Sequence, residues 1–116
     1  MEKLFSLVLF VTALLSTPGI TDPRFDWSTE GAHVIVVEGT YIPDHNFFKI
    51  DADAGSQCPA GTWLKWPGQG PDTLAQQKNV EAVYSMLLAA KLSNSRVNVF
   101  GRDQDCTVNF IHLTGQ

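Results

Sequence analysis

The sequence has few basic residues, only two cysteines and no apolar run long enough to cross a membrane as a helix. Lysine and arginine total 8 of 116 residues, against 12 aspartates and glutamates, so the net charge is −4. Nucleic-acid binding draws on clustered basic side chains, and no cluster is present, so we expect no nucleic-acid partner. Apolar residues make up 44% of the chain, which excludes a disordered polypeptide and suffices for one domain.

A short apolar segment opens the chain. Residues 4–15 contain ten apolar residues out of twelve, and small, helix-breaking residues follow at 16–19. Twelve residues rise about 18 Å as a helix, too little for a hydrocarbon core of about 30 Å. This order is typical of a secretory signal peptide. We therefore predict a cleaved signal peptide over residues 1–19, a single domain over residues 20–116 and a secreted or periplasmic location.

Export changes what the two cysteines, Cys58 and Cys106, indicate. In an oxidising compartment an even count of two predicts one disulfide. A zinc site would need more ligands at short spacing, and a catalytic cysteine would leave the other as an unpaired thiol. We therefore predict a Cys58–Cys106 bridge that spans 48 positions.

Hydrophobic patterning predicts five strands and one helix. Short apolar and aromatic runs favour strands at 33–37, 47–50, 61–66, 96–100 and 106–113, and a polar extended arm at 22–32. A helical stripe is formed by Val80, Val83, Tyr84, Leu87, Leu88 and Leu92. Thr73 or Asp72 is suited to begin this helix, and Asn94 is suited to end it.

Three strands, one helix and two strands are the element order of an OB-fold. This fold is a mainly β, five-stranded Greek-key barrel (β-β-β-α-β-β) with its helix between strands three and four. Strands three and five run parallel and touch in that barrel, so Cys58 and Cys106 at their starts can be bridged. A small α+β roll is the alternative.

Motifs for catalysis and metal binding are missing. His33, His45 and His112 are far apart in the sequence, and the calcium-like run that begins at Asp51 has Gly55 and Thr62 where ligands are needed. Nucleophile elbows, phosphate loops and paired-carboxylate motifs do not occur. We predict no enzyme activity, no catalytic residues, no cofactor and no metal, and keep a small secreted hydrolase only as a third class.

Tryptophans and a second helix face indicate contacts between subunits. Strand alternation places Trp63 and Trp66 on opposite faces, so at least one faces away from the core. Both are predicted as subunit-interface candidates, with sugar stacking or core packing as alternatives. Met86, Ala89 and Ala90 form an apolar face beside the helical stripe, which favours helix–helix contact in an oligomer.

The order of these features resembles the B subunits of subtilase cytotoxin and typhoid toxin. The runs 34–37, 44–50 and 96–99, the Trp63 segment and the single helix follow in matching order over 34–113. The resemblance implies an OB-fold protein that forms a homo-oligomeric ring, most often a pentamer. It also implies a cell-surface glycan or glycoprotein receptor and an enzymatic A subunit as partners.

The chain departs from that family at the sugar site. A serine near the start of the first strand binds sialic acid there, whereas residues 31–33 here contain none. Phe100 stands where the family has a tyrosine, and the cysteine-rich C-terminal tail is missing. The scaffold is therefore expected to carry over without the sialic-acid site.

We expect a neutral or weakly charged glycan instead, bound without metal by two loops. Candidate residues are Tyr41, Asp44 and Asn46 in the first loop, and Arg102, Asp103 and Gln104 in the second. An aromatic plane matches a sugar's apolar face, and amides or carboxylates match its hydroxyls. The alternative function is a stand-alone periplasmic or extracellular binding or inhibitor module without an A subunit.

Overall fold

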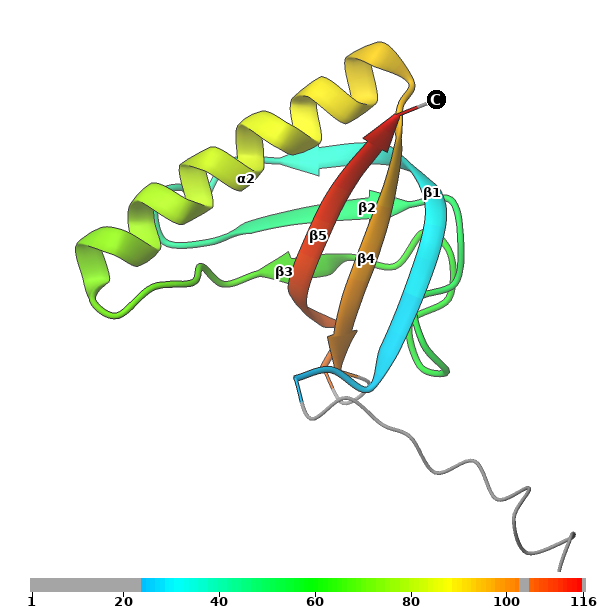
Figure 1. The fold of residues 1–116 in the computed structure, drawn as a ribbon, viewed down its shortest axis with the longest axis horizontal. Coiled ribbons are helices and arrows are strands. Elements are labelled where there is room, and N and C mark those ends of the chain that lie inside the picture. The colour runs from blue at the N-terminus through cyan, green and yellow to red at the C-terminus, as the bar shows by residue number, and fades with distance from the viewer. Residues whose placement is uncertain (1–23, 103–104, 116) are drawn as a thin grey trace, which may run out of the picture.

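The computed structural model describes residues 24–102 and 105–115, so the predicted signal peptide lies outside the described residues. Five strands and one helix follow one another in the predicted order (Figure 1). Their bounds are β1 Trp27–Glu38, β2 Asn46–Ile50, β3 Leu64–Trp66, α2 Thr73–Ser93, β4 Arg96–Arg102 and β5 Thr107–Gly115.

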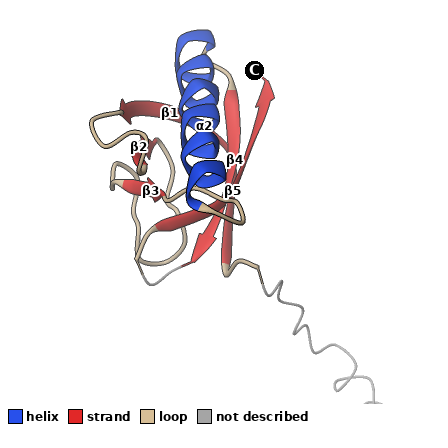
Figure 2. Cartoon of the chain, turned by 90° about the vertical axis from the view of Figure 1, so that its left-hand side faces the viewer, coloured by secondary structure: helices blue, strands red, loops and turns tan. Residues whose placement is uncertain are grey.

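The strands close into a barrel in the order β1-β2-β3-β5-β4, with β4 returning to β1. All neighbouring strands are antiparallel except β3 and β5, which are parallel. The helix packs against β1, β2 and β5, and Figure 2 shows it along one side of the strands. This arrangement confirms the predicted OB-fold-like architecture, mainly β with one helix.

Strand alternation sets the core. On β2 the inward side chains are Asn46, Phe48 and Ile50, and on β4 they include Val97 and Val99. All five are almost fully buried. The helix adds four buried side chains to this core, namely Val80, Val83, Leu87 and Ala90.

Side-chain and backbone bonds define both ends of α2. Asp72 is the N-cap, and its carboxylate accepts a hydrogen bond of 2.8 Å from the backbone N–H of Ala75. Asn94 ends the helix in the left-handed conformation at φ 56°, as predicted.

The prediction that Leu92 belongs to the buried stripe of the helix is wrong, because Leu92 is 86% exposed. Each step of four residues overshoots a full turn by about 40°, because consecutive helical residues are about 100° apart. A stripe that runs through Tyr84 and Leu88 has therefore left the core face by Leu92.

β1 is longer than predicted and bends where it changes partner. It includes residues 27–32 of the predicted arm, and Trp27 at its start is buried. Up to His33 it pairs with β4, and from Val34 it pairs with β2. A bulge between Thr29 and Ala32 precedes the bend. Gly31 lies in this bulge with φ +75°, a value that favours glycine.

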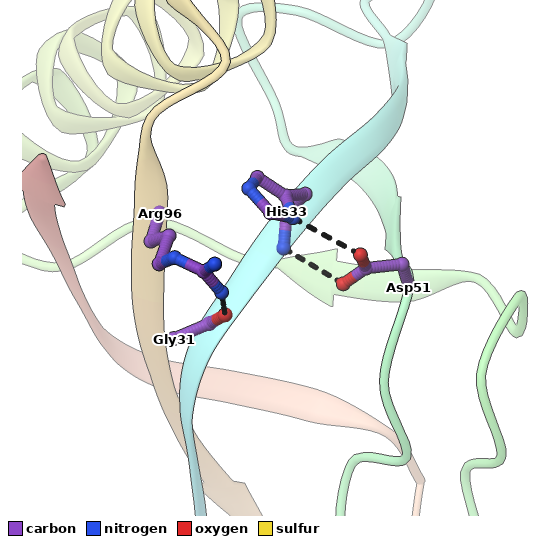
Figure 3. A network of polar contacts seen from close by, with 4 residues as sticks. All are labelled: Gly31, His33, Asp51 and Arg96. Atoms are coloured by element: carbon purple, nitrogen blue, oxygen red, sulfur yellow. Dashed lines mark hydrogen bonds and ion pairs between the residues drawn. The ribbon is translucent and has the colours of Figure 1, made fainter. Parts of the chain in front are cut away.

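Polar contacts hold this bend (Figure 3). The His33 backbone N–H donates to Asp51 Oδ1 at 2.8 Å, and His33 Nδ1 lies 3.1 Å from Asp51 Oδ2. Arg96 on β4 donates to the Gly31 carbonyl at 2.8 Å. The backbone bond from His33 lowers the pKa of Asp51, so this carboxylate stays charged at neutral pH.

The barrel closes at the short parallel contact between β3 and β5. One residue pair, Lys65 with Thr107, forms that ladder, and the Lys65 N–H donates to the Cys106 carbonyl at 3.1 Å. The predicted disulfide lies beside it, with the Cα atoms of Cys58 and Cys106 5.9 Å apart. The bridge therefore reinforces the seam at which the barrel has least backbone pairing.

Two residues predicted at a subunit interface belong to the core. Trp66 and Ala90 are 4% and 1% exposed, so the prediction is wrong for both. The Trp66 indole N–H donates to Asn79 Oδ1 at 2.8 Å, and the same oxygen accepts from the Gln69 backbone at 3.0 Å. Trp66 turns inward because β3 alternates with Lys65 outside, and Asn79 on α2 offers its indole N–H an acceptor.

Replacing one cysteine should destabilise the domain. Cys106→Ser is expected to lower the free energy of unfolding by about 2–5 kcal/mol, because the unfolded chain loses a long cross-linked loop. Urea unfolding measures the change, and Cys58→Ser combined with Cys106→Ser should cost no more than either alone. Two thiols that alkylate freely in the unreduced native protein would contradict the bridge.

Removing the Asn79 amide should leave the buried Trp66 donor without its acceptor. Asn79→Ala is therefore expected to cost about 1–3 kcal/mol of folding stability in thermal or urea unfolding. Lys78→Ala, at an exposed position of the same helix, is the control and should change stability by less than about 0.5 kcal/mol. Equal effects of the two substitutions would show that the Trp66–Asn79 bond is unimportant.

Candidate functional site

An aromatic pocket lies on the outer face of β2 and β3. It has a volume of about 260 Å³ and is lined by Glu38, Tyr41, Phe47 and Trp63. We call it the β2–β3 pocket. Glu38 ends β1, Tyr41 is in the following loop, Phe47 is on β2, and Trp63 immediately precedes β3. Three separate segments of the chain therefore supply its walls.

Strand alternation explains why these aromatic residues face outward. Phe48 points into the core and pairs with Leu64, so its neighbour Phe47 points out of the barrel. Trp63 precedes the buried Leu64 in the same way and is 43% exposed. Tyr41 lies in the loop and is 50% exposed. The pocket is thus built from side chains that the core does not use.

The rings of the pocket stand at steep angles to one another. The Tyr41 and Phe47 centroids are 5.8 Å apart with an interplanar angle of 81°. Phe47 and Trp63 are 6.3 Å apart at 68°. His45 stacks on Tyr41 at 4.9 Å and 13°, and its Nδ1 lies 2.6 Å from the Asp44 carboxylate. This stacking supports the tyrosine ring from outside the pocket.

The charged groups around the pocket are of both signs. Thr40 donates hydrogen bonds from its side chain and its backbone to the Glu38 carboxylate, which lowers the pKa of Glu38. The backbone bond, from Thr40 N–H to Glu38 Oε1, is 2.6 Å long. Lys49 Nζ lies 4.4 Å from the Trp63 ring centroid, a cation–π contact, but Lys49 does not line the pocket. At neutral pH the lining therefore carries one negative charge, from Glu38.

The structure gives the three first-loop candidates different positions. Tyr41 lines the pocket, and Asp44 supports it through His45. Asn46 is fully buried, so its prediction as a surface ligand-binding residue is wrong. Its amide donates to the Val80 carbonyl at 3.3 Å and ties β2 to α2. Asn46 points inward because it shares the face of Phe48 and Ile50.

The second loop does not join the pocket. Arg102 ends β4, whereas Asp103 and Gln104 lie outside the described residues. Gly101, next to Arg102, pairs with Trp27 at the start of β1, while the pocket lies at the other end of that strand, at Glu38. The prediction of one site shared by both loops is therefore wrong for Tyr41 and Arg102, because β1 separates them.

Sequence reasoning missed Glu38 and Phe47. The alternation that buries Phe48 already places Phe47 outside, on the face that also carries Lys65, its partner on β3. Antiparallel pairing one step further places Trp63 beside Lys49, which their cation–π contact reflects. No pattern in the sequence indicates that Glu38 lines the pocket, because the path of the chain after β1 determines which side chains lie beside it.

The remaining interface candidates lie on or near the surface. Trp63 belongs to the pocket, and Ala89 is exposed. Met86 is half-buried and lines a second hollow of about 340 Å³ between α2 and β5, with Val83 and Ile111 also in its lining. We call this hollow the α2–β5 groove.

A second aromatic cluster covers β4 and β5. It surrounds a hollow of about 310 Å³ lined by Arg24, Phe25, Phe100, Phe110 and His112. The strand register places Ser28 directly opposite Phe100. Ser28 therefore borders this aromatic cluster.

Metal-binding geometry is not seen among residues 24–102 and 105–115, where no three histidine, cysteine or acidic side chains gather to hold an ion. No helix in that part of the chain is long and apolar enough to span a membrane. Comparison with protein-family models, curated proteins and solved structures finds no match for the chain. Its fold and its surface chemistry are therefore the basis for a functional proposal.

Proposed function

We propose that this chain is a secreted, non-enzymatic OB-fold protein that binds a cell-surface glycan in the β2–β3 pocket. The observation that carries the proposal is an ionised carboxylate, Glu38, beside the half-exposed rings of Tyr41 and Trp63. Sugars pair an apolar ring face with a rim of hydroxyls, so aromatic planes and a carboxylate match both parts. OB-folds use this strand face and the loop between strands one and two for oligosaccharides.

Export supports the extracellular part of the proposal. The Cys58–Cys106 bridge is the type of cross-link that persists in oxidising compartments. The first 19 residues have the composition of a signal peptide. A secreted domain with a surface sugar pocket fits a receptor-binding subunit, whose partner is an enzymatic A subunit.

Assembly into a ring is the second part of the proposal. The toxin B subunits that the sequence resembles act as ring pentamers, and a ring multiplies weak single-site affinities. Met86 in the α2–β5 groove and the exposed Ala89 offer an apolar contact for a second copy. The rival is a stand-alone extracellular binding module, which would use the same pocket as a monomer.

Glycan binding should depend on the pocket and not on the second loop. On a glycan array the purified protein is expected to retain at least one neutral or weakly charged glycan. Tyr41→Ala should weaken that binding about tenfold or more, which corresponds to about 1.4 kcal/mol. Arg102→Ala, an exposed substitution outside the pocket, is the control. Failure to retain any glycan, or equal losses for both variants, would contradict this site.

Ring formation should appear as a multiple of the subunit mass. Light scattering after size exclusion at tens of micromolar is expected to give a mass near five subunits. Ala89→Glu should shift the protein towards the monomer without unfolding it. Gln77→Glu is the matched control, because Gln77 lies about 120° round the helix from Ala89 and about 180° from Met86. A strictly monomeric wild-type protein would favour the stand-alone module.

A further inference from the structure

The β2–β3 pocket has the form of an aromatic cage. Phe47 is its central wall, and Tyr41 and Trp63 stand against it at 81° and 68°. Their centroids lie 5.8 and 6.3 Å from that of Phe47, which is edge-to-face contact, and the three rings and Glu38 together line the pocket of about 260 Å³. A cation in such a space meets more than one electron-rich ring within about 6 Å, the range of cation–π attraction.

The remaining wall of the cage is negatively charged. Glu38 is the one ionisable carboxylate among the four lining residues, and its bonds from Thr40 keep it charged at neutral pH. Rings and carboxylate therefore attract the same kind of group. Within the lining, an anion would meet both the carboxylate and the negative faces of the rings, and the nearby positive charge, Lys49, lies over Trp63 outside the lining.

A cation already uses one of these rings. Lys49 Nζ lies 4.4 Å from the Trp63 centroid, so the indole attracts an ammonium group within this structure. Lys49 is not among the lining residues, and the pocket of about 260 Å³ remains available to a ligand.

From these features we infer that the β2–β3 pocket binds a quaternary ammonium group of the choline type. A primary ammonium carries three N–H donors that need acceptors, whereas one oxygen of Glu38 already accepts from Thr40 and the walls are rings. A quaternary ammonium has no N–H to satisfy and presents methyl groups to the rings. Aromatic cages recognise this group by the same chemistry.

This inference rests on the site of the proposed function and specifies the part of the ligand that enters it. A choline group reaches the cell surface from two sources, as a substituent on a glycan or as the headgroup of a lipid. Both present the same trimethylammonium to the cage. The glycan source agrees with the proposed function, and the lipid source would replace the glycan while leaving the cage chemistry intact.

The direct test is titration of the purified protein with choline chloride by calorimetry. Choline is expected to bind with a dissociation constant in the millimolar range or below. Its neutral isostere 3,3-dimethyl-1-butanol should bind at least about tenfold more weakly, because it has the shape without the charge. Equal binding of the two compounds, or no choline binding at tens of millimolar, overturns the inference.

Two variants assign the binding to the cage. Glu38→Gln removes the charge and keeps an oxygen for the Thr40 bond, and Trp63→Ala removes a wall that is half in solvent. Each should weaken choline binding at least about fivefold, while Phe25→Ala, in the aromatic cluster that covers β4 and β5, should leave it unchanged. Circular dichroism checks that each variant is folded. Choline binding that survives both cage variants overturns the assignment.

Two further measurements separate this inference from the proposed function. Phosphatidylcholine vesicles test the lipid source, and a glycan array with and without choline-substituted glycans tests the other. If choline binds but no glycan is retained, the proposed function is contradicted and the inference of an ammonium-binding cage stands. If neutral glycans are retained but choline does not bind, the cage inference is overturned and the proposed function stands.

Discussion

The barrel depends on one narrow seam. β3 is three residues long and meets β5 through a single residue pair, so backbone hydrogen bonds alone contribute little to closure there. The Cys58–Cys106 bridge lies beside that pair and limits how far the two strands can separate in the unfolded chain. Without the seam the sheet would have two open edges, and β3 would be held by β2 alone.

Closure at the seam also builds the pocket. The segment from Cys58 to Leu64 is anchored at one end by the disulfide and at the other end by the buried Leu64. These two anchors hold Trp63 on the outer face of the sheet, beside Lys49 of β2. The bend of β1 at His33, fixed by Asp51, brings the end of that strand alongside β2 and so delivers Glu38. The two ends of the pocket are therefore positioned by covalent and polar constraints in the scaffold.

The sequence was informative where composition, the order of elements or turn chemistry alone decides the outcome. The disulfide, the left-handed Asn94 cap and the order of elements follow from composition, spacing and turn chemistry, and the structure has all three. Asn46, Trp66 and Ala90 were misplaced because their burial depends on partners in other elements, as with Asn79 for Trp66. The two-loop site failed for a similar reason: only the path of β1 shows that Tyr41 and Arg102 lie apart.

Core and pocket share strands but not side chains. On β2 the side chains of Asn46, Phe48 and Ile50 are buried, while Phe47 and Lys49 between them face the outer surface. Period-two alternation thus lets one short strand stabilise the barrel with one face and line the β2–β3 pocket with the other. Outward aromatic residues add little to the buried core, so their loss tests recognition with little interference from folding. Their gathering with Glu38, where three chain segments meet, forms the β2–β3 pocket without drawing on the side chains of the core.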